Sequence, residues 1–150
     1  MKRILFYAFF YVILPLSGIN HSANAQLRKD GFVLSYDGTF LEKYVGKESY
    51  VILPTSVTDI AAGAFWECKS LKFIAIPPAV ETIGHSAFFN CKNLKTVCVS
   101  WSTPLKLDYN PFRNLNLGKM KLEVPRGTRS RYALAPVWKE FGEMVEYNLF

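Results

Sequence analysis

The side chains after residue 25 that are best suited to metal binding, disulfide formation or nucleophilic chemistry are three cysteines and one histidine: Cys68, Cys91, Cys98 and His85. A zinc site needs further histidine or cysteine ligands, and the sequence offers none close to Cys68 and Cys91. An odd number of cysteines cannot all pair within one chain. We expect Cys68 and Cys91 to be buried free thiols, with a disulfide or a metal pair as the alternatives. Cys98 is expected to face outward as a candidate reactive thiol.

Hydrolytic chemistry has little support in the sequence. His85 is expected to be an exposed structural residue in a turn, and no serine or cysteine has the surroundings of an activated nucleophile. Asp59 and Glu81 lie at near-equivalent places in a repeat and could form a glycosidase-like pair, but solvated turn residues are the favoured interpretation. No phosphate-binding glycine loop or calcium loop is present. We therefore predict that the protein is not an enzyme and binds no cofactor or metal.

An internal repeat dominates the chain between Leu53 and Val97. The segment LPTSVTDIAAGAFWECKSLKFI is followed, 23 residues later, by IPPAVETIGHSAFFNCKNLKTV. The matched positions include proline, valine, isoleucine, Ala-Phe, cysteine and leucine. Self-similarity at such a period is the signature of a solenoid, in which each repeat is one coil and buries its apolar face against its neighbours.

The apolar pattern within each repeat predicts the shape of a coil. Ile74 and Ile76 alternate with other residues, as do Val97 and Val99, which indicates short strands with one buried face. A proline ends the strand because it lacks an N–H group. The Ala-Phe pair then begins a short helical turn. We expect Ile74 and Val97 to lie side by side on adjacent parallel strands.

The ends of the chain depart from the repeat. Residues 26–50 are expected to form an N-terminal β cap of two or three strands. Residues 51–99 form two repeats, and residues 100–150 form a degenerate repeat and a C-terminal helical cap interrupted by Pro136. After Val99 the expected proline is missing, and Pro111-Phe112 resembles the Ala-Phe turn one residue late. The predicted class is α/β, a short leucine-rich-repeat solenoid with stacked parallel strands and short helical turns.

The segment IPPAVETIGHSAFFNCKNLKTV resembles the BspA-type leucine-rich repeat of bacterial surface proteins. Residues 51–99 match its pattern closely, although Ala61 stands where a glycine is usual, whereas Gly84 keeps it. Residues 103–146 look like the C-terminal end common in such proteins of Bacteroidetes. The resemblance implies a curved solenoid, an exported or surface location and a loose association with adhesion to host proteins. It implies no catalytic site.

The first 25 residues have the pattern of a secretory signal peptide. Lys2 and Arg3 precede an apolar stretch, and Ala23-Asn24-Ala25 supplies the small residues that a signal peptidase needs. A membrane anchor is the alternative, but Pro15 interrupts the apolar stretch. Cleavage after Ala25 would lower the formal net charge from +6 to +4. We expect an exported protein that is secreted, held at the cell surface or periplasmic, with no transmembrane segment after signal removal.

A binding surface is expected on the outward side of the strand ladder. In the predicted register, exposed tyrosine and phenylalanine lie beside lysines, which is the composition of a protein-binding patch. Two alternatives are that cap loops cover Tyr50 and Phe73 and that the register differs, which would turn these residues inward. The tentative protein-binding residues are Tyr50, Lys72, Phe73, Ala75, Lys95, Thr96, Cys98, Lys121 and Glu123.

The leading functional prediction is a secreted or surface module that binds a protein ligand, either a host extracellular protein or a bacterial surface protein. The runner-up is an assembly component that stacks on itself or on a larger surface complex through its end coils, with Trp138 and Phe141 involved. Arg126, Arg129 and Arg131 form a basic stretch that is interpreted as a solvated face, with weak affinity for acidic surfaces as the alternative. No nucleic-acid motif accompanies it.

Overall fold

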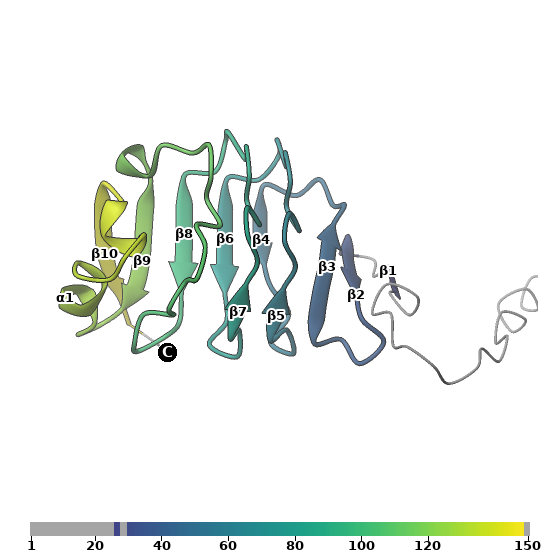
Figure 1. Ribbon diagram of the computed structural model, residues 1–150, viewed down its shortest axis with the longest axis horizontal. Helices are drawn as coiled ribbons and strands as arrows, with labels where there is room; N and C mark the ends of the chain where they lie inside the picture. Colours follow the sequence, from purple (N-terminus) through teal and green to yellow (C-terminus); the bar gives the residue numbers. More distant parts are fainter. Residues whose placement is uncertain (1–25, 28–29, 149–150) are drawn as a thin grey trace, which may run out of the picture.

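The structure is a computed structural model and describes residues 26–27 and 30–148. The proposed signal peptide lies outside the described residues. The chain winds into stacked coils along the long axis of the molecule (Figure 1). Its main sheet has the strand order β10-β9-β8-β6-β4. These strands are β4 (Tyr50–Ile52), β6 (Phe73–Ile76), β8 (Thr96–Val99), β9 (Lys121–Pro125) and β10 (Glu143–Tyr147).

A second sheet forms the other long side of the coils, with the strand order β1-β2-β3-β5-β7. Its parallel part is β3, β5 and β7, and antiparallel pairing adds β2 and then β1 at the N-terminal end. In Figure 1, β2 and β1 lie beyond β3 at that end of the stack. The strands are β1 (Gln26–Leu27), β2 (Phe32–Leu34), β3 (Phe40–Tyr44), β5 (Asp59–Ile60) and β7 (Thr82–Ile83).

The register of the main sheet confirms the predicted solenoid. Ile74 of β6 pairs with Val97 of β8 in parallel, and both side chains are completely buried. The same inward row continues to Val51 on β4 and to Leu122 on β9. Each coil has too little apolar surface to form a core alone, so this row is shielded only because the strands stack.

Proline ends two of the main-sheet strands, as the sequence predicts. β4 ends at Ile52, two residues before Pro54, and β6 ends at Ile76, directly before Pro77. The chain then turns toward the second sheet, and the carbonyl oxygens of Pro54 and Pro77 accept hydrogen bonds from Val57 and Val80 at 3.1 and 3.2 Å. The turn places both valines in the core, where each is at most 1% exposed.

The Ala-Phe turns build an aromatic column through the core. Phe65 and Phe88 stack with ring centroids 5.0 Å apart, and Phe88 and Phe112 stack at 5.3 Å. Phe112 therefore occupies the equivalent place in the degenerate repeat, which confirms the interpretation of Pro111-Phe112. Tyr44 extends the column toward the N-terminus, and Trp138 extends it toward the C-terminus.

A polar ladder runs beside this column and was not foreseen from the sequence. Glu67, Asn90 and Asn114 follow the successive turns and have positive φ angles of 53°, 58° and 64°. The Asn90 side chain donates a hydrogen bond to Glu67 Oε1, and the Asn114 side chain donates to Asn90 Oδ1. Asparagine tolerates the left-handed region better than most residues, which was the available signal.

Trp101 lies at the place where the third coil lacks the proline that follows the strand in the coils before it. Its indole N–H donates a 2.8 Å hydrogen bond to the carbonyl oxygen of Val80, and the side chain is 8% exposed. The hydroxyl of Tyr132 donates in turn to the carbonyl oxygen of Trp101 at 2.9 Å. Two buried aromatic residues thus hold this connection where proline holds the others.

The C-terminal end is less helical than predicted. It contains only α1 (Arg129–Tyr132) and the 3-10 turn η3 (Trp138–Glu140), and a further 3-10 turn, η2 (Leu117–Lys119), precedes β9. The chain then forms β10, which pairs in parallel with β9 along five residues. The sequence missed this strand because most of its side chains are exposed, so its position is set by backbone pairing at the sheet edge.

Within the described residues, no helix has the length and apolar character needed to cross a lipid bilayer.

Candidate interaction surface

Two rows of side chains point outward from the main sheet, and the strand pairing gives both of them directly. The register that the sequence predicted for these rows is therefore confirmed, and the alternative in which they turn inward is wrong. β10, which was not predicted, extends the rows with Glu143 and Val145. The first row is Tyr50, Phe73, Thr96 and Lys121, and the second row is Ile52, Ala75, Cys98 and Glu123.

The apolar end of these rows lies on β4. Tyr50 and Ile52 are each 73% exposed, so the described part of the chain does not cover Tyr50. Phe73 is half-buried because its ring stacks on Tyr50, with centroids 5.8 Å apart and an interplanar angle of 28°. The pair presents aromatic surface to solvent on β4 and β6.

The opposite end of the same face is polar. Lys121 Nζ lies 3.3 Å from Glu123 Oε1 on β9. Tyr147 of β10 reaches back over the sheet, and its hydroxyl donates to the carbonyl oxygen of Val99 at 2.9 Å and lies 3.1 Å from Ser100 Oγ. The outward face therefore changes from aromatic at β4 to charged and hydrogen-bonded at β9 and β10.

Cys98 lies between these two ends and is half-buried. Burial raises the pKa of its thiol, and the negative charge of Glu123 raises it further. A thiol with a raised pKa contains less of the reactive thiolate at neutral pH. The structure thus gives no support to the expectation that Cys98 is a reactive thiol.

The other two cysteines are free thiols, as predicted for this column. Cys91 is fully buried and donates a hydrogen bond to the carbonyl oxygen of Phe65 at 2.9 Å. Burial raises the pKa of Cys91 to about 12. Cys68 is only half-buried, which corrects the expectation that both are buried, and its sulfur lies 3.6 Å from Ser70 Oγ.

His85 is exposed and lines a cleft of about 380 Å³ beside the second sheet, together with Glu81 and Tyr109. Its Nε2 lies 2.9 Å from Arg113 Nη1. Because a guanidinium group can only donate, Nε2 is the acceptor of this hydrogen bond. The contact joins the His85 ring to the Arg113 side chain.

The carboxylate of Asp59 is held by threonines rather than by a second acid. It accepts hydrogen bonds from the hydroxyls of Thr58 and Thr82. Thr82, not Glu81, pairs with Asp59 across the second sheet. These contacts fit the structural interpretation of Asp59.

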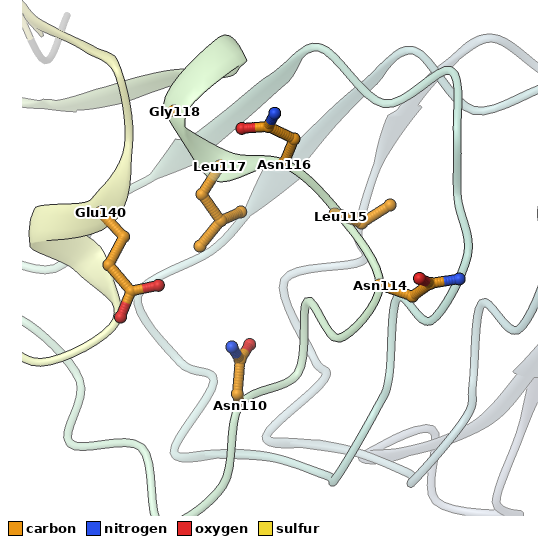
Figure 2. A pocket seen from close by; sticks show the side chains of 7 residues that line it. All are labelled: Asn110, Asn114, Leu115, Asn116, Leu117, Gly118 and Glu140. Atoms are coloured by element: carbon orange, nitrogen blue, oxygen red, sulfur yellow. The ribbon is translucent and has the colours of Figure 1, made fainter.

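A larger cleft of about 580 Å³ lies between the turn after Phe112 and η3 (Figure 2). Figure 2 shows Glu140 on the η3 side and the asparagines along the chain that leads to η2. Asn110 accepts a 2.8 Å hydrogen bond from the Phe112 amide, and Asn114 belongs to the polar ladder. Two asparagine side chains of the cleft are thus already engaged, Asn110 with the backbone turn and Asn114 with the polar ladder. Its lining residues are Asn110, Asn114, Leu115, Asn116, Leu117, Gly118 and Glu140.

Comparison with known families agrees with the coil geometry. The family model described as BspA type Leucine rich repeat region (6 copies) matches residues 41–130. The chain belongs to this family. The matched segment contains the strands from β4 to β9 and, with them, the Tyr50–Phe73 pair. It also contains the turns that line the two clefts. The resemblance of residues 51–99 to the BspA-type repeat is therefore confirmed.

The solved structures to which this BspA-type chain is similar include a leucine rich cell surface protein from Faecalibacterium prausnitzii A2-165. The two are 23% identical, with a TM-score of 0.47. The match covers 69% of this chain and 37% of the other, so the chain spans little more than a third of that protein's length. Among curated proteins, none matches this chain.

Proposed function

We propose that the protein is an exported module that binds another protein through the outward face of its main sheet. The observation that carries this proposal is the stacked Tyr50–Phe73 pair, which exposes aromatic surface directly beside lysines. Aromatic residues at the centre and charge at the rim are the composition of protein interfaces. The proposed contact residues are those named from the sequence: Tyr50, Lys72, Phe73, Ala75, Lys95, Thr96, Cys98, Lys121 and Glu123.

Membership of the BspA-type family supports a protein-interaction role and a location at the cell surface or outside the cell. We propose that this role is adhesion and that it involves no catalysis, since His85 and Asp59 are committed to structural hydrogen bonds. The lysines at the rim favour a ligand with an acidic surface, because opposite charge speeds association and selects partners.

The ends of the solenoid are proposed to act as caps. At the N-terminal end, Phe32 and Leu34 of β2 are 4% and 2% exposed, and the Phe32 ring lies 5.2 Å from that of Tyr44. At the C-terminal end, Trp138 and Phe141 pack on Phe112. Both ends thus cover the aromatic column with side chains of their own, as a solenoid requires. We retain residues 26–50 as the extent of the proposed N-terminal cap, and residues 100–150 as the extent of the degenerate repeat together with the proposed C-terminal cap.

The test uses two exposed tyrosines as a matched pair. Tyr50 is 73% exposed on β4, and Tyr109 is 63% exposed in the cleft that His85 and Glu81 also line. Immobilised wild-type protein is first used to capture ligands from host extracellular proteins and bacterial lysate. The affinity of the captured species is then measured for three variants: Tyr50→Ser, Phe73→Asp and Tyr109→Ser. We expect affinity to fall at least tenfold in the first two variants and to stay within twofold in the third. Equal binding by all three variants would exclude this face.

Assembly through the ends is the second candidate, and one observation favours it. β4 and β10 are the two edges of the main sheet, so each has one row of backbone groups outside the ladder. Trp138 and Phe141, which the sequence suggested for this contact, are 0% and 7% exposed and belong to the core instead. Val145 on β10, at 38% exposed, is the appropriate residue to change. Light scattering after size exclusion should show concentration-dependent growth that Val145→Asp abolishes; a monomer at every concentration would rule assembly out.

A further inference from the structure

Lysines repeat in the turns that precede three strands of the main sheet, β6, β8 and β9. The segments CKSLK and CKNLK place Lys69 and Lys72 in one coil and Lys92 and Lys95 at the same positions in the next coil. The third coil supplies Lys119 and Lys121 around the start of β9. We call these six residues the lysine ridge. Five of them are exposed and Lys121 is half-buried.

The backbone fixes the spacing of the ridge. The amide of Lys95 donates to the carbonyl oxygen of Lys72 at 2.9 Å, and the amide of Lys121 donates to the carbonyl oxygen of Lys95 at 2.8 Å. The Asn93 side chain joins the outer positions by donating to the carbonyl oxygen of Lys69 at 2.7 Å. Successive lysines therefore start from backbones about 4.8 Å apart, the separation of neighbouring strands.

Buried leucines hold these turns in place from the inside. Leu71, Leu94 and Leu117 are at most 5% exposed. Because Leu71 and Leu94 each lie between the two lysines of their coil, the lysine side chains are directed to solvent while the leucines anchor the turn. The ridge is thus a preformed surface, and its order does not depend on contacts among the lysines themselves.

The positive charge of the ridge is largely uncompensated. Lys121 pairs with Glu123 at 3.3 Å, and no other lysine of the ridge has an ion pair with a described residue. Clustered like charges repel one another, and a bound anion would reduce that repulsion. Beside it lies a shallow cleft of about 430 Å³ lined by Lys95, Lys119 and Lys121, with Glu143 at its border.

We propose that the lysine ridge binds a linear anionic polysaccharide, with its sulfate or carboxylate groups on the ammonium groups of successive coils. The ridge offers a periodic line of positive charge, and a polysaccharide carries its negative charge in the same periodic way. Lysine supplies a compact charge on a flexible stem, which suits anions whose geometry varies along a polymer. Basic clusters of this kind raise the local concentration of polyanions.

An acidic peptide is a poorer match for the ridge than a polysaccharide. A peptide strand gains much of its affinity by pairing its backbone with free backbone groups. The carbonyl oxygens of Lys72 and Lys95 already accept hydrogen bonds from the next coil. These backbone groups are therefore already paired, and the ammonium groups are the charged groups that the ridge presents to a ligand.

This site is separate from the aromatic end of the proposed protein-binding face, although Lys72, Lys95 and Lys121 belong to both. Lys69, Lys92 and Lys119 belong to the ridge alone. Variants at Lys69 and Lys92 therefore test the ridge, and Tyr50→Ser tests the protein-binding face. Either proposal can fail while the other stands.

The experiment measures binding of fluorescent dextran sulfate to the full chain by anisotropy at two salt concentrations. The ridge variant is Lys69→Gln/Lys92→Gln, and the control is Lys43→Gln/Lys139→Gln, which removes the same charge from exposed lysines elsewhere. We expect at least a tenfold loss of affinity in the ridge variant and less than a threefold loss in the control. Binding should weaken as salt rises, because exposed charges are screened.

Competing polymers decide the class of ligand. Neutral dextran should not bind, and polyglutamate and oligo-dT of equal charge should bind at least tenfold more weakly than dextran sulfate. Equal loss in the ridge and control variants would overturn the site. Equal binding of polyglutamate or oligo-dT would overturn the polysaccharide assignment. Unchanged circular dichroism spectra and melting temperatures would show that the variants remain folded.

Discussion

The indole N–H of Trp101 donates to the carbonyl oxygen of Val80 across 21 residues of sequence, in a buried part of the solenoid. The bond links the turn after β8 to the turn after β6. It satisfies a carbonyl group that has no access to water, and it does so at the one strand end where the repeat lacks its proline. A single side chain thus links the third coil to the second at this position.

Replacement of this indole should weaken the fold more than its loss of volume suggests. In Trp101→Phe, the Val80 carbonyl group loses its donor, and an unsatisfied buried acceptor costs about 1–3 kcal/mol. Urea unfolding of the variant should give a free energy of unfolding lower by at least that amount. Trp66→Phe, at an exposed tryptophan, serves as the control and should change it by less than about 0.5 kcal/mol.

The aromatic column should be most sensitive at its centre. Phe88 is completely buried between Phe65 and Phe112, so Phe88→Ala leaves a cavity with ring neighbours on both sides. A loss of about 3–5 kcal/mol is expected, in line with other buried phenylalanines. Phe89→Ala, next in sequence but only half-buried, should cost clearly less. Similar midpoints for the two variants in chemical denaturation would contradict the expectation that loss of a fully buried ring of the column costs more than loss of a half-buried one.

Gly84 is expected to resist substitution because its coil lies directly against the coil before it. A Cβ atom at this position would lie 2.6 Å from the carbonyl carbon of Ala61. Gly84→Ala therefore forces the two coils apart and should destabilise the protein by about 1–3 kcal/mol. Ala61 occupies the equivalent place one coil earlier, and Ala61→Gly should cost no more than about 1 kcal/mol. Thermal melts of both variants would check this difference.

Glu146 should give the C-terminal end a dependence on pH. Hydrogen bonds from the amides of Arg129 and Gly127 hold the pKa of this exposed carboxylate below its ordinary value of 4.5. A lowered pKa in the folded state means that its stabilisation is complete above pH 4.5 and is lost as the pH falls through the folded-state pKa. Glu146→Ala should therefore lower the melting temperature at pH 7 and have progressively less effect on acidification.

The control for that prediction is Glu143→Ala, an exposed glutamate on the same strand. Its effect on the melting temperature should be smaller at pH 7. A constant difference between wild type and Glu146→Ala from pH 7 to pH 3 would mean that the carboxylate does not stabilise the start of α1 through its charge.

The repeat made most of the coil predictable from sequence. Equal spacing of Ile74 and Val97 fixes which strands pair and in which register, because a slip of one residue would expose the whole buried row. The same argument located Tyr50 and Phe73 on the outward face. The missing proline at Ser100 gave no comparable signal. It did not predict the hydrogen bonds of Trp101 and Tyr132 that hold this connection.

What the chain by itself determined was the periodic part: the direction of the side chains on the strands of the repeated coils follows from a pattern of apolar residues at constant spacing. Only the tertiary structure decided the end at β10, the inward turn of Trp101 and the ladder from Glu67 to Asn114. Those features depend on backbone groups and single hydrogen bonds that meet across coils. The β10 pairing and the Trp101 hydrogen bond leave no periodic trace in sequence, because each occurs once and joins residues that are far apart along the chain. The ladder does repeat, but its hydrogen bonds join different residue types, Glu67 and two asparagines.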